Sequence, residues 1–185
     1  MNSVIYDDLY RRTGKKDIWT LLKELCVPQF RFIFLKRMCE LTRKRKRICF
    51  FFPFFRFLYG HYKITYLTDI PARVSIGRGF RIGHVGGIVI NPDVVIGNNV
   101  DIYNGVLLGV NFRGRKKGCP TIKDNVFIGA NAVVCGNITI GCDVLIAPNS
   151  FVDFDVPDHS IVSGNPSIIK PRECATRDFV TLTIE

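Results

Sequence analysis

The 185-residue sequence lacks the signatures of several protein classes. Its seven cysteines are scattered singly, without a Cys-x-x-Cys pair, so neither a cysteine zinc site nor a dithiol redox centre is indicated. The first twenty residues are polar and charged, unlike a secretory signal peptide. The longest apolar run, residues 48–59, is interrupted by Pro53 and Arg56 and is too short for a membrane-spanning helix. These features predict a cytoplasmic protein with reduced thiols.

Acidic residues are scarce in the first third of the chain. Residues 1–60 hold fourteen Lys and Arg against five Asp and Glu, whereas residues 61–185 hold twelve against eleven. Five consecutive cations, Arg43–Arg47, stand beside seven aromatic residues in 48–59. This composition is typical of a segment that lies on an anionic bilayer. It predicts a peripheral contact with the inner face of the cell membrane.

Two other interpretations of this basic, aromatic segment are open. A basic run can bind nucleic acid, but no nucleic-acid module accompanies this one, and we expect no nucleic-acid partner. The phenylalanines can also pack on the rest of the chain or across an oligomer. Residues 17–42, just before the basic run, have the pattern of an amphipathic helix with a break near Pro28. We expect the remainder of the chain to fold without residues 1–60, because its repeats begin only at Ile70.

An aliphatic residue recurs at every sixth position between residues 70 and 152. A period of six is neither that of a helix nor that of a simple strand. It indicates short strands joined by turns, three of which close a coil of about eighteen residues, so that stacked coils bury the aliphatic rows. The register breaks between 106 and 122, which indicates an inserted loop at 110–120. The rows are Ile70, Ile76, Ile82, Ile88, Val94, Val100 and Val106, with Ile90, Ile96, Ile102 and Leu108, and then Ile122, Ile128, Val134, Ile140, Ile146 and Val152, with Val126, Ala132, Ile138 and Val144.

One repeat contains a distinctive histidine motif. Residues 82–91 read Ile-Gly-His-Val-Gly-Gly-Ile-Val-Ile-Asn, which resembles the histidine segment of hexapeptide-repeat acyltransferases, namely serine acetyltransferases and their polysaccharide-modifying relatives. The resemblance covers 68–171 and implies a mainly β fold, a left-handed parallel β-helix. It leaves a partly helical segment at 1–67 and a tail at 172–185. It also implies a homotrimer with its active site between chains, acetyl-CoA as acyl donor and no metal.

The resemblance assigns His84 as the general base and Asp69 as the carboxylate that orients it. An alcohol must lose its proton as it attacks a thioester, and a neutral imidazole is well suited to accept that proton. Such a base contributes roughly a hundred- to ten-thousand-fold in rate. The alternatives are structural: His84 as a turn residue satisfied by backbone carbonyls, and Asp69 as a turn or helix-capping residue.

The resemblance also places the two substrates. Small residues at Gly109, Ala130 and Ala147 would let the pantetheine arm of coenzyme A lie against the coils, although turn geometry alone also explains small residues there. Lys170 and Arg172 would contact the 3′-phosphate.

Asn104, Arg113 and Cys119 are assigned to the acceptor, and the other loop cations, Arg115, Lys116 and Lys117, would attract phosphates or an anionic acceptor, unless they are simply solvated. Serine acetyltransferases end this loop with Arg-His-Pro. This chain has Gly118-Cys119-Pro120 instead.

The missing arginine and histidine favour an acceptor other than serine. We therefore predict an O-acetyltransferase that acts on a saccharide of bacterial surface polysaccharide, lipid-linked if the front end contacts membrane. The alternatives are a serine O-acetyltransferase of cysteine biosynthesis and a structural solenoid without catalysis. A γ-type carbonic anhydrase, which shares the solenoid, is discounted because its zinc needs three histidines, and His61 and His159 lie outside the clear repeats.

Overall fold

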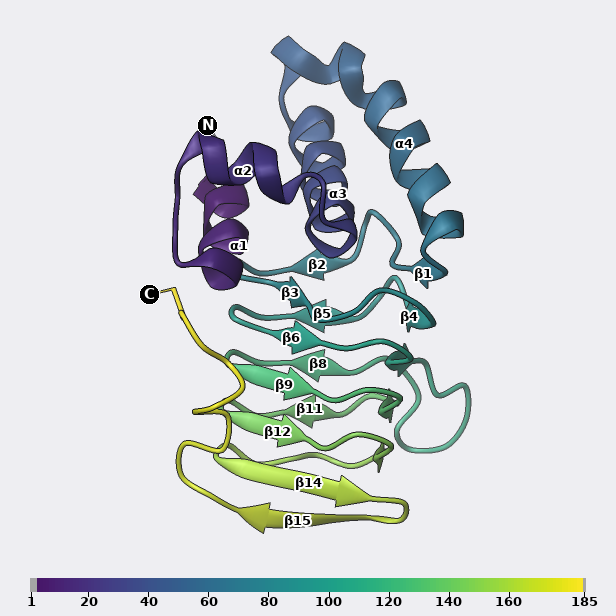
Figure 1. Cartoon of the computed structure of the whole chain (residues 1–185). Coiled ribbons are helices and arrows are strands. Elements are labelled where there is room, and N and C mark those ends of the chain that lie inside the picture. The colour runs from purple at the N-terminus through teal and green to yellow at the C-terminus, as the bar shows by residue number, and fades with distance from the viewer. Residues whose placement is uncertain (1–2, 185) are drawn as a thin grey trace.

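The computed structural model describes residues 3–184 as a β-helix of about five turns with helices at its N-terminal end (Figure 1). Three sheets form its walls. Sheet A contains β1 (Thr68–Asp69), β4 (Ile88–Ile90), β7 (Leu107–Gly109), β10 (Val133–Cys135) and β13 (Phe151–Val152). Sheet B contains β2 (Ser75–Ile76), β5 (Val95–Ile96), β8 (Thr121–Ile122) and β11 (Thr139–Ile140). Sheet C contains β3 (Arg81–Ile82), β6 (Asp101–Ile102), β9 (Val126–Ile128), β12 (Val144–Ile146), β14 (Ser160–Gly164) and β15 (Ser167–Pro171).

The chain visits the three sheets in turn, and neighbouring strands are parallel except for the antiparallel pair β14–β15. Every aliphatic position of the six-residue rows is buried, and all of them belong to one continuous core. The predicted parallel β-helix with a short helical N-terminal segment is confirmed, and its hand is consistent with the left-handed form.

The coils differ in length in a way that the six-residue rows conceal. Ile90 lies opposite Leu108, eighteen residues on, but Ile82 lies opposite Ile102, twenty residues on. The turn at residues 83–87 therefore holds two extra residues. Alternate residues of a strand face the same way, so two extra residues leave the aliphatic side chains facing inward. They only place residues of the first six-residue row opposite residues of the second row. The spacing in the sequence therefore looks regular although the coils differ in length. The motif with His84 is thus an outward bulge of the first coil.

The helices cover the open end of the β-helix (Figure 1). They are α1 (Ser3–Thr13), α2 (Ile18–Glu24), α3 (Pro28–Lys44), the 3₁₀ helix η1 (Lys46–Phe51) and α4 (Phe52–Thr65). The predicted amphipathic helix at 17–42 is divided at Pro28, which begins α3. Phe32 and Tyr59 are fully buried in the same core cluster as Ile70 and its row.

Polar side chains from these helices bind the exposed edge of the first coil. Within the stack, each coil donates N–H groups to carbonyls of the next coil, as Gly77 does to Ile96 at 2.9 Å. The strand carbonyls of the first coil have no preceding coil to satisfy them, and buried carbonyls need donors. Arg37 of α3 donates to two of them, on Ile76 at 2.8 Å and Gly77 at 2.5 Å.

Other side chains complete this capping. Arg37 itself is held by the carboxylate of Asp8 in α1, whose other oxygen accepts from the Phe80 N–H at 3.0 Å. Burial raises the pKa of Asp8, and the neighbouring Arg37 opposes that rise. The remaining caps are Lys36 to the Val74 oxygen at 3.0 Å, Arg11 to Gly79 at 3.1 Å, Tyr59 to Ile70 at 2.6 Å and Gln29 to Gly83 at 3.3 Å.

These contacts argue against the expectation that the solenoid folds without residues 1–60. Removal of the helices would expose the apolar end of the core and leave the first-coil carbonyls to water. The basic segment is therefore in large part structural, although Arg43–Arg47 and several phenylalanines stay exposed. No helix in the described part of the chain is long and apolar enough to cross a membrane.

The C-terminal tail runs back along sheet C toward the first coils (Figure 1). Asp143 accepts backbone N–H groups from Ala175 and Thr176, both at 2.9 Å. Farther along, the Asn99 side chain exchanges two hydrogen bonds of 3.0 Å with the backbone of Ile184. The tail is thus fastened to turns of two different coils.

We predict that Arg37→Ala lowers the free energy of unfolding by about 3–5 kcal/mol, because it leaves a buried carboxylate and two carbonyls unpaired. Urea unfolding followed by circular dichroism measures the loss. Arg43→Ala is the matched control, since Arg43 lies on the same helix but is exposed; it should change the value by no more than about 0.5 kcal/mol. Equal effects of the two substitutions would contradict the capping role.

Candidate active site

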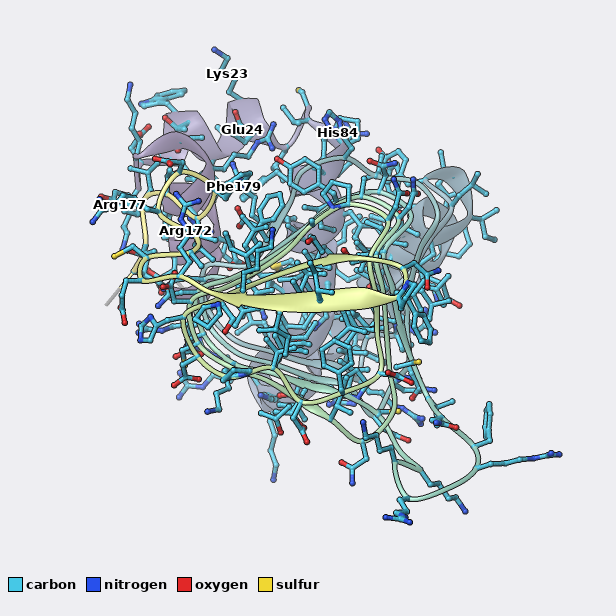
Figure 2. The ribbon with its side chains drawn as sticks, turned by 90° about the horizontal axis from the view of Figure 1, so that it is seen from below. Lys23, Glu24, His84, Arg172, Arg177 and Phe179 are labelled. Carbon is cyan, nitrogen blue, oxygen red and sulfur yellow. The ribbon has the colours of Figure 1, made fainter. Side chains whose placement is uncertain are left out.

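His84 lies on the two-residue bulge between β3 and β4, at the corner where sheets C and A meet. Its side chain is exposed, and Figure 2, which looks along the β-helix, shows it at the rim of the molecule. Exposure is what a general base needs if it is to reach a substrate. A histidine satisfied by backbone carbonyls is not what the structure shows, since no such hydrogen bond forms within the described residues.

Glycines shape the turn that carries His84. Gly86 and Gly87 have φ values of 114° and 67°, a region that side chains rarely adopt. The Gly86 N–H donates to the Thr68 hydroxyl at 3.3 Å, and its carbonyl accepts from Gly105 at 2.9 Å. The turn is therefore tied both to β1 and to the next coil.

Two residues that sequence reasoning missed contact the same turn. The ring of Tyr103 lies edge-on to the imidazole of His84, with centroids 5.9 Å apart. A Cβ on Gly83 would lie 2.6 Å from that ring, so a larger residue at this position would displace the ring of Tyr103. Gln29 of α3 donates to the Gly83 carbonyl at 3.3 Å. The twenty-residue spacing of Gly83 and Tyr103 is the signal for their contact, once the longer first coil is known.

Asp69 is not in contact with His84 within this chain. It lies in β1 with 61% of its side chain exposed, and Lys63 of α4 is 2.5 Å from its carboxylate. No hydrogen bond joins Asp69 to His84 among the described residues. The carboxylate–imidazole pair therefore stays a prediction. It requires Asp69 to break its ion pair with Lys63 and to bind the imidazole of His84 instead.

Three of the other predicted site residues are stacked along the His84 corner. Asn104, Ala130 and Ala147 occupy this corner in the second, third and fourth coils. Backbone hydrogen bonds of 2.9 Å link the successive turns, from Asn131 to Asn104 and from Asn149 to Ala130. The structure thus places the small residues assigned to coenzyme A in line with the turn of His84.

The remaining coenzyme A residues lie elsewhere. Gly109 ends β7 at the corner between sheets A and B, beside the inserted loop. Lys170 is exposed on the last strand, β15, and Arg172 follows it, with its backbone N–H bonded to the His159 carbonyl at 2.7 Å. A single chain therefore does not gather all the predicted contacts on one surface.

The inserted loop has an ordered base and a free, basic tip. Asn111 and Gly118 exchange backbone hydrogen bonds of 2.9 and 3.0 Å, and the Lys116 amine donates to the Asp153 carbonyl at 2.6 Å. Arg113, Arg115 and Lys117 are exposed and form no ion pair within the described residues. The loop projects from a different corner than the one that bears His84 (Figure 2).

The end of this loop differs chemically from what the resemblance implies. Cys119 is half-buried against the core, where burial raises the pKa of its thiol. Gly118 has φ 133°, a conformation that an arginine would adopt only with strain. The backbone conformation at position 118 therefore favours glycine over the arginine of Arg-His-Pro. Within the described residues no cluster of side chains suited to a metal is present.

Comparison with known proteins gives the repeats their identity. The model of the family described as bacterial transferase hexapeptide (six repeats) matches residues 119–153. Serine acetyltransferase of Staphylococcus xylosus is 46% identical over 101 residues, which is 55% of this chain and 47% of the relative. That of Escherichia coli K12 is 36% identical over 113 residues, 61% of this chain and 41% of the relative. The chain spans less than half the length of the curated relatives it matches.

Solved structures extend the likeness beyond the repeats. The serine acetyltransferase of Neisseria gonorrhoeae in complex with serine matches with a TM-score of 0.71 and 31% identity, over 91% of this chain and 68% of that one. This chain belongs to the hexapeptide-repeat acetyltransferase family, in its serine acetyltransferase-like branch. Its relative from Brucella abortus in complex with coenzyme A matches with a TM-score of 0.73 and 28% identity, over 92% of this chain and 67% of that one.

Membership in this branch corrects the predicted function. The saccharide acceptor, and with it a role in surface polysaccharide, is wrong, because the relatives at 36–46% identity are serine acetyltransferases. The prediction gave too much weight to the absence of Arg-His-Pro from a single loop. More than half of the chain aligns with serine acetyltransferases, at 44–46% identity.

Proposed function

We propose that this protein is an acetyl-CoA-dependent serine O-acetyltransferase. The observation that carries the proposal is the exposed His84 on its glycine turn, in line with a corner of small residues, in a chain similar to enzymes of that activity. The similarity to structures with serine and with coenzyme A supports both substrates.

The proposed reaction follows general-base chemistry. The neutral imidazole of His84 accepts the proton of the serine hydroxyl while the oxygen attacks the thioester carbonyl of acetyl-CoA. The resulting tetrahedral intermediate collapses, the carbon–sulfur bond breaks, and the imidazolium returns its proton to the departing thiolate. O-acetylserine and free coenzyme A are the products. Asp69 would stabilise the imidazolium, at the expense of its ion pair with Lys63.

The carboxylate of the acceptor serine needs a cation to bind it. Gly118 and Cys119 carry no positive charge, so the cation must come from another part of the protein. Arg113, Arg115 and Lys117 are the unpaired cations of the inserted loop. They suit either the serine carboxylate or the phosphates of coenzyme A. In one chain this loop and His84 project from different corners (Figure 2). A loop from a neighbouring chain would bring these cations to His84, and this supports a homotrimer in which each active site lies between two chains.

We predict that the purified protein forms O-acetylserine from serine and acetyl-CoA, and that His84→Ala lowers kcat at least about a hundredfold. Thermal stability should be unchanged, because His84 is exposed. Release of free thiol and mass detection of O-acetylserine measure the reaction. Asp69→Asn should cost less, since the base remains.

His61→Ala is the matched control for this experiment, because His61 is also exposed but lies on α4. It should retain normal turnover. Normal turnover by the His84 variant would place the base elsewhere. Absence of O-acetylserine with the wild-type protein, at saturating acetyl-CoA and high serine, would reject serine as the acceptor.

A separate prediction concerns assembly. Light scattering coupled to size-exclusion chromatography should give three times the 21.0 kDa mass of the chain, because the proposed site needs a second copy. An active monomer would contradict the shared site.

A further inference from the structure

The side of η1 and α4 that points away from the β-helix is apolar and uncovered. Phe50, Phe54, Phe57 and Ile64 are 70, 57, 74 and 78% exposed. The spacings of three and seven residues place Phe54, Phe57 and Ile64 on one face of α4, and Phe50 lies in η1 just before it. Figure 1 shows α4 at the outer end of the molecule. Several large apolar side chains exposed on one side of a folded protein mark an interaction surface.

The opposite face of the same helix already has its partner. Phe52, Phe55, Tyr59 and Tyr62 belong to or pack against the core cluster that α3 shares with the β-helix. α4 is therefore apolar on both faces while only one is buried, which is not the pattern of an ordinary surface helix. The outward face is not needed to hold the helix in place. We call Phe50, Phe54, Phe57 and Ile64 the outer face.

The charges around the outer face are of one sign. From residue 41 to residue 68 the chain holds seven Lys and Arg and no Asp or Glu. Arg43–Arg47 are all exposed and form no ion pair within the described residues. A cavity of about 320 Å³ between α3, α4 and the first coil is lined by Arg43, Arg56 and Arg73, among others. Its lining carboxylate, Glu40, is already bound by Lys36 and Arg37.

Charge complementarity selects the occupant of this surface. A second copy docked through the same face would bring both basic runs to one interface, where like charges repel. A bilayer with anionic headgroups offers phosphates to the cations and an acyl boundary to the phenylalanines. We propose that the outer face and Arg43–Arg47 form a docking site for an anionic phospholipid bilayer. This proposal stands independently of the acetyl acceptor.

The test is co-sedimentation of the full-length protein with vesicles of phosphatidylcholine alone and of phosphatidylcholine with phosphatidylglycerol. We expect binding to the anionic vesicles only, and its loss at 1 M salt, where the Debye length falls to about 3 Å. Each cation near such a surface contributes about fivefold to partitioning, so R43Q/R45Q/R47Q should weaken it roughly a hundredfold. The matched control is R113Q/R115Q/K117Q, which removes three exposed cations from the inserted loop and should have little effect.

A second pair of variants tests the apolar part. Phe57→Ser should weaken vesicle binding at least about tenfold. Phe112→Ser removes an equally exposed phenylalanine, 75% against 74%, from the inserted loop and should leave binding intact.

Equal binding to neutral vesicles, or equal losses from both members of either matched pair, would overturn the proposal. The proposal would also be overturned if the protein does not bind vesicles. If the protein then forms a larger assembly that Phe57→Ser dissolves, the outer face joins copies of the chain. Binding of a single-stranded oligonucleotide in place of vesicles would also overturn it.

Discussion

The carbonyl edge of the first coil is the constraint on which the rest of this structure depends. A β-helix satisfies its backbone by stacking, so its first turn always presents acceptors without donors. Here the donors are buried side chains of α1, α3 and α4: Arg11, Lys36, Arg37 and Tyr59. Lys36 and Arg37 are 2 and 3% exposed at their side chains. Such burial of cations is costly unless they are paired, and here carboxylates and carbonyls satisfy them.

The same edge positions the histidine. Gln29 of α3 binds the carbonyl immediately before His84, and Thr68 at the start of sheet A binds the glycine turn behind it. The helical cap therefore supports the turn as well as the core. Because the turn holds two residues more than the equivalent turn of the second coil, the imidazole stands clear of the wall. Along the same corner the later coils carry Asn104, Ala130 and Ala147, and Ala147 packs against a cluster that includes Ala175 and Val180 of the tail.

The repeating core was predictable because each inward position obeys one simple rule of spacing. The helical cap was only half predictable. Its helices follow from the sequence, but the contacts of Asp8 with Arg37, twenty-nine residues apart, and of Arg11 with Asp101, ninety apart, have no local signature. The turn that carries His84 and the inserted loop could be located in the sequence because glycines mark the one and a break in the period marks the other. The predicted acceptor was wrong because the absence of Arg-His-Pro shows only which side chains are missing from this loop. It does not show which residues elsewhere take their place.

The central claim is that His84 of one chain works with the inserted loop of another. Mixed trimers test it most directly. His84→Ala subunits and R113A/R115A/K117A subunits, each with little activity alone, are unfolded together and refolded, and acetyl transfer is measured. If the site is shared, about a quarter of the sites in random mixtures combine an intact histidine with an intact loop, and activity returns. If histidine and loop serve within one chain, the mixture will show only the sum of the two inactive parents.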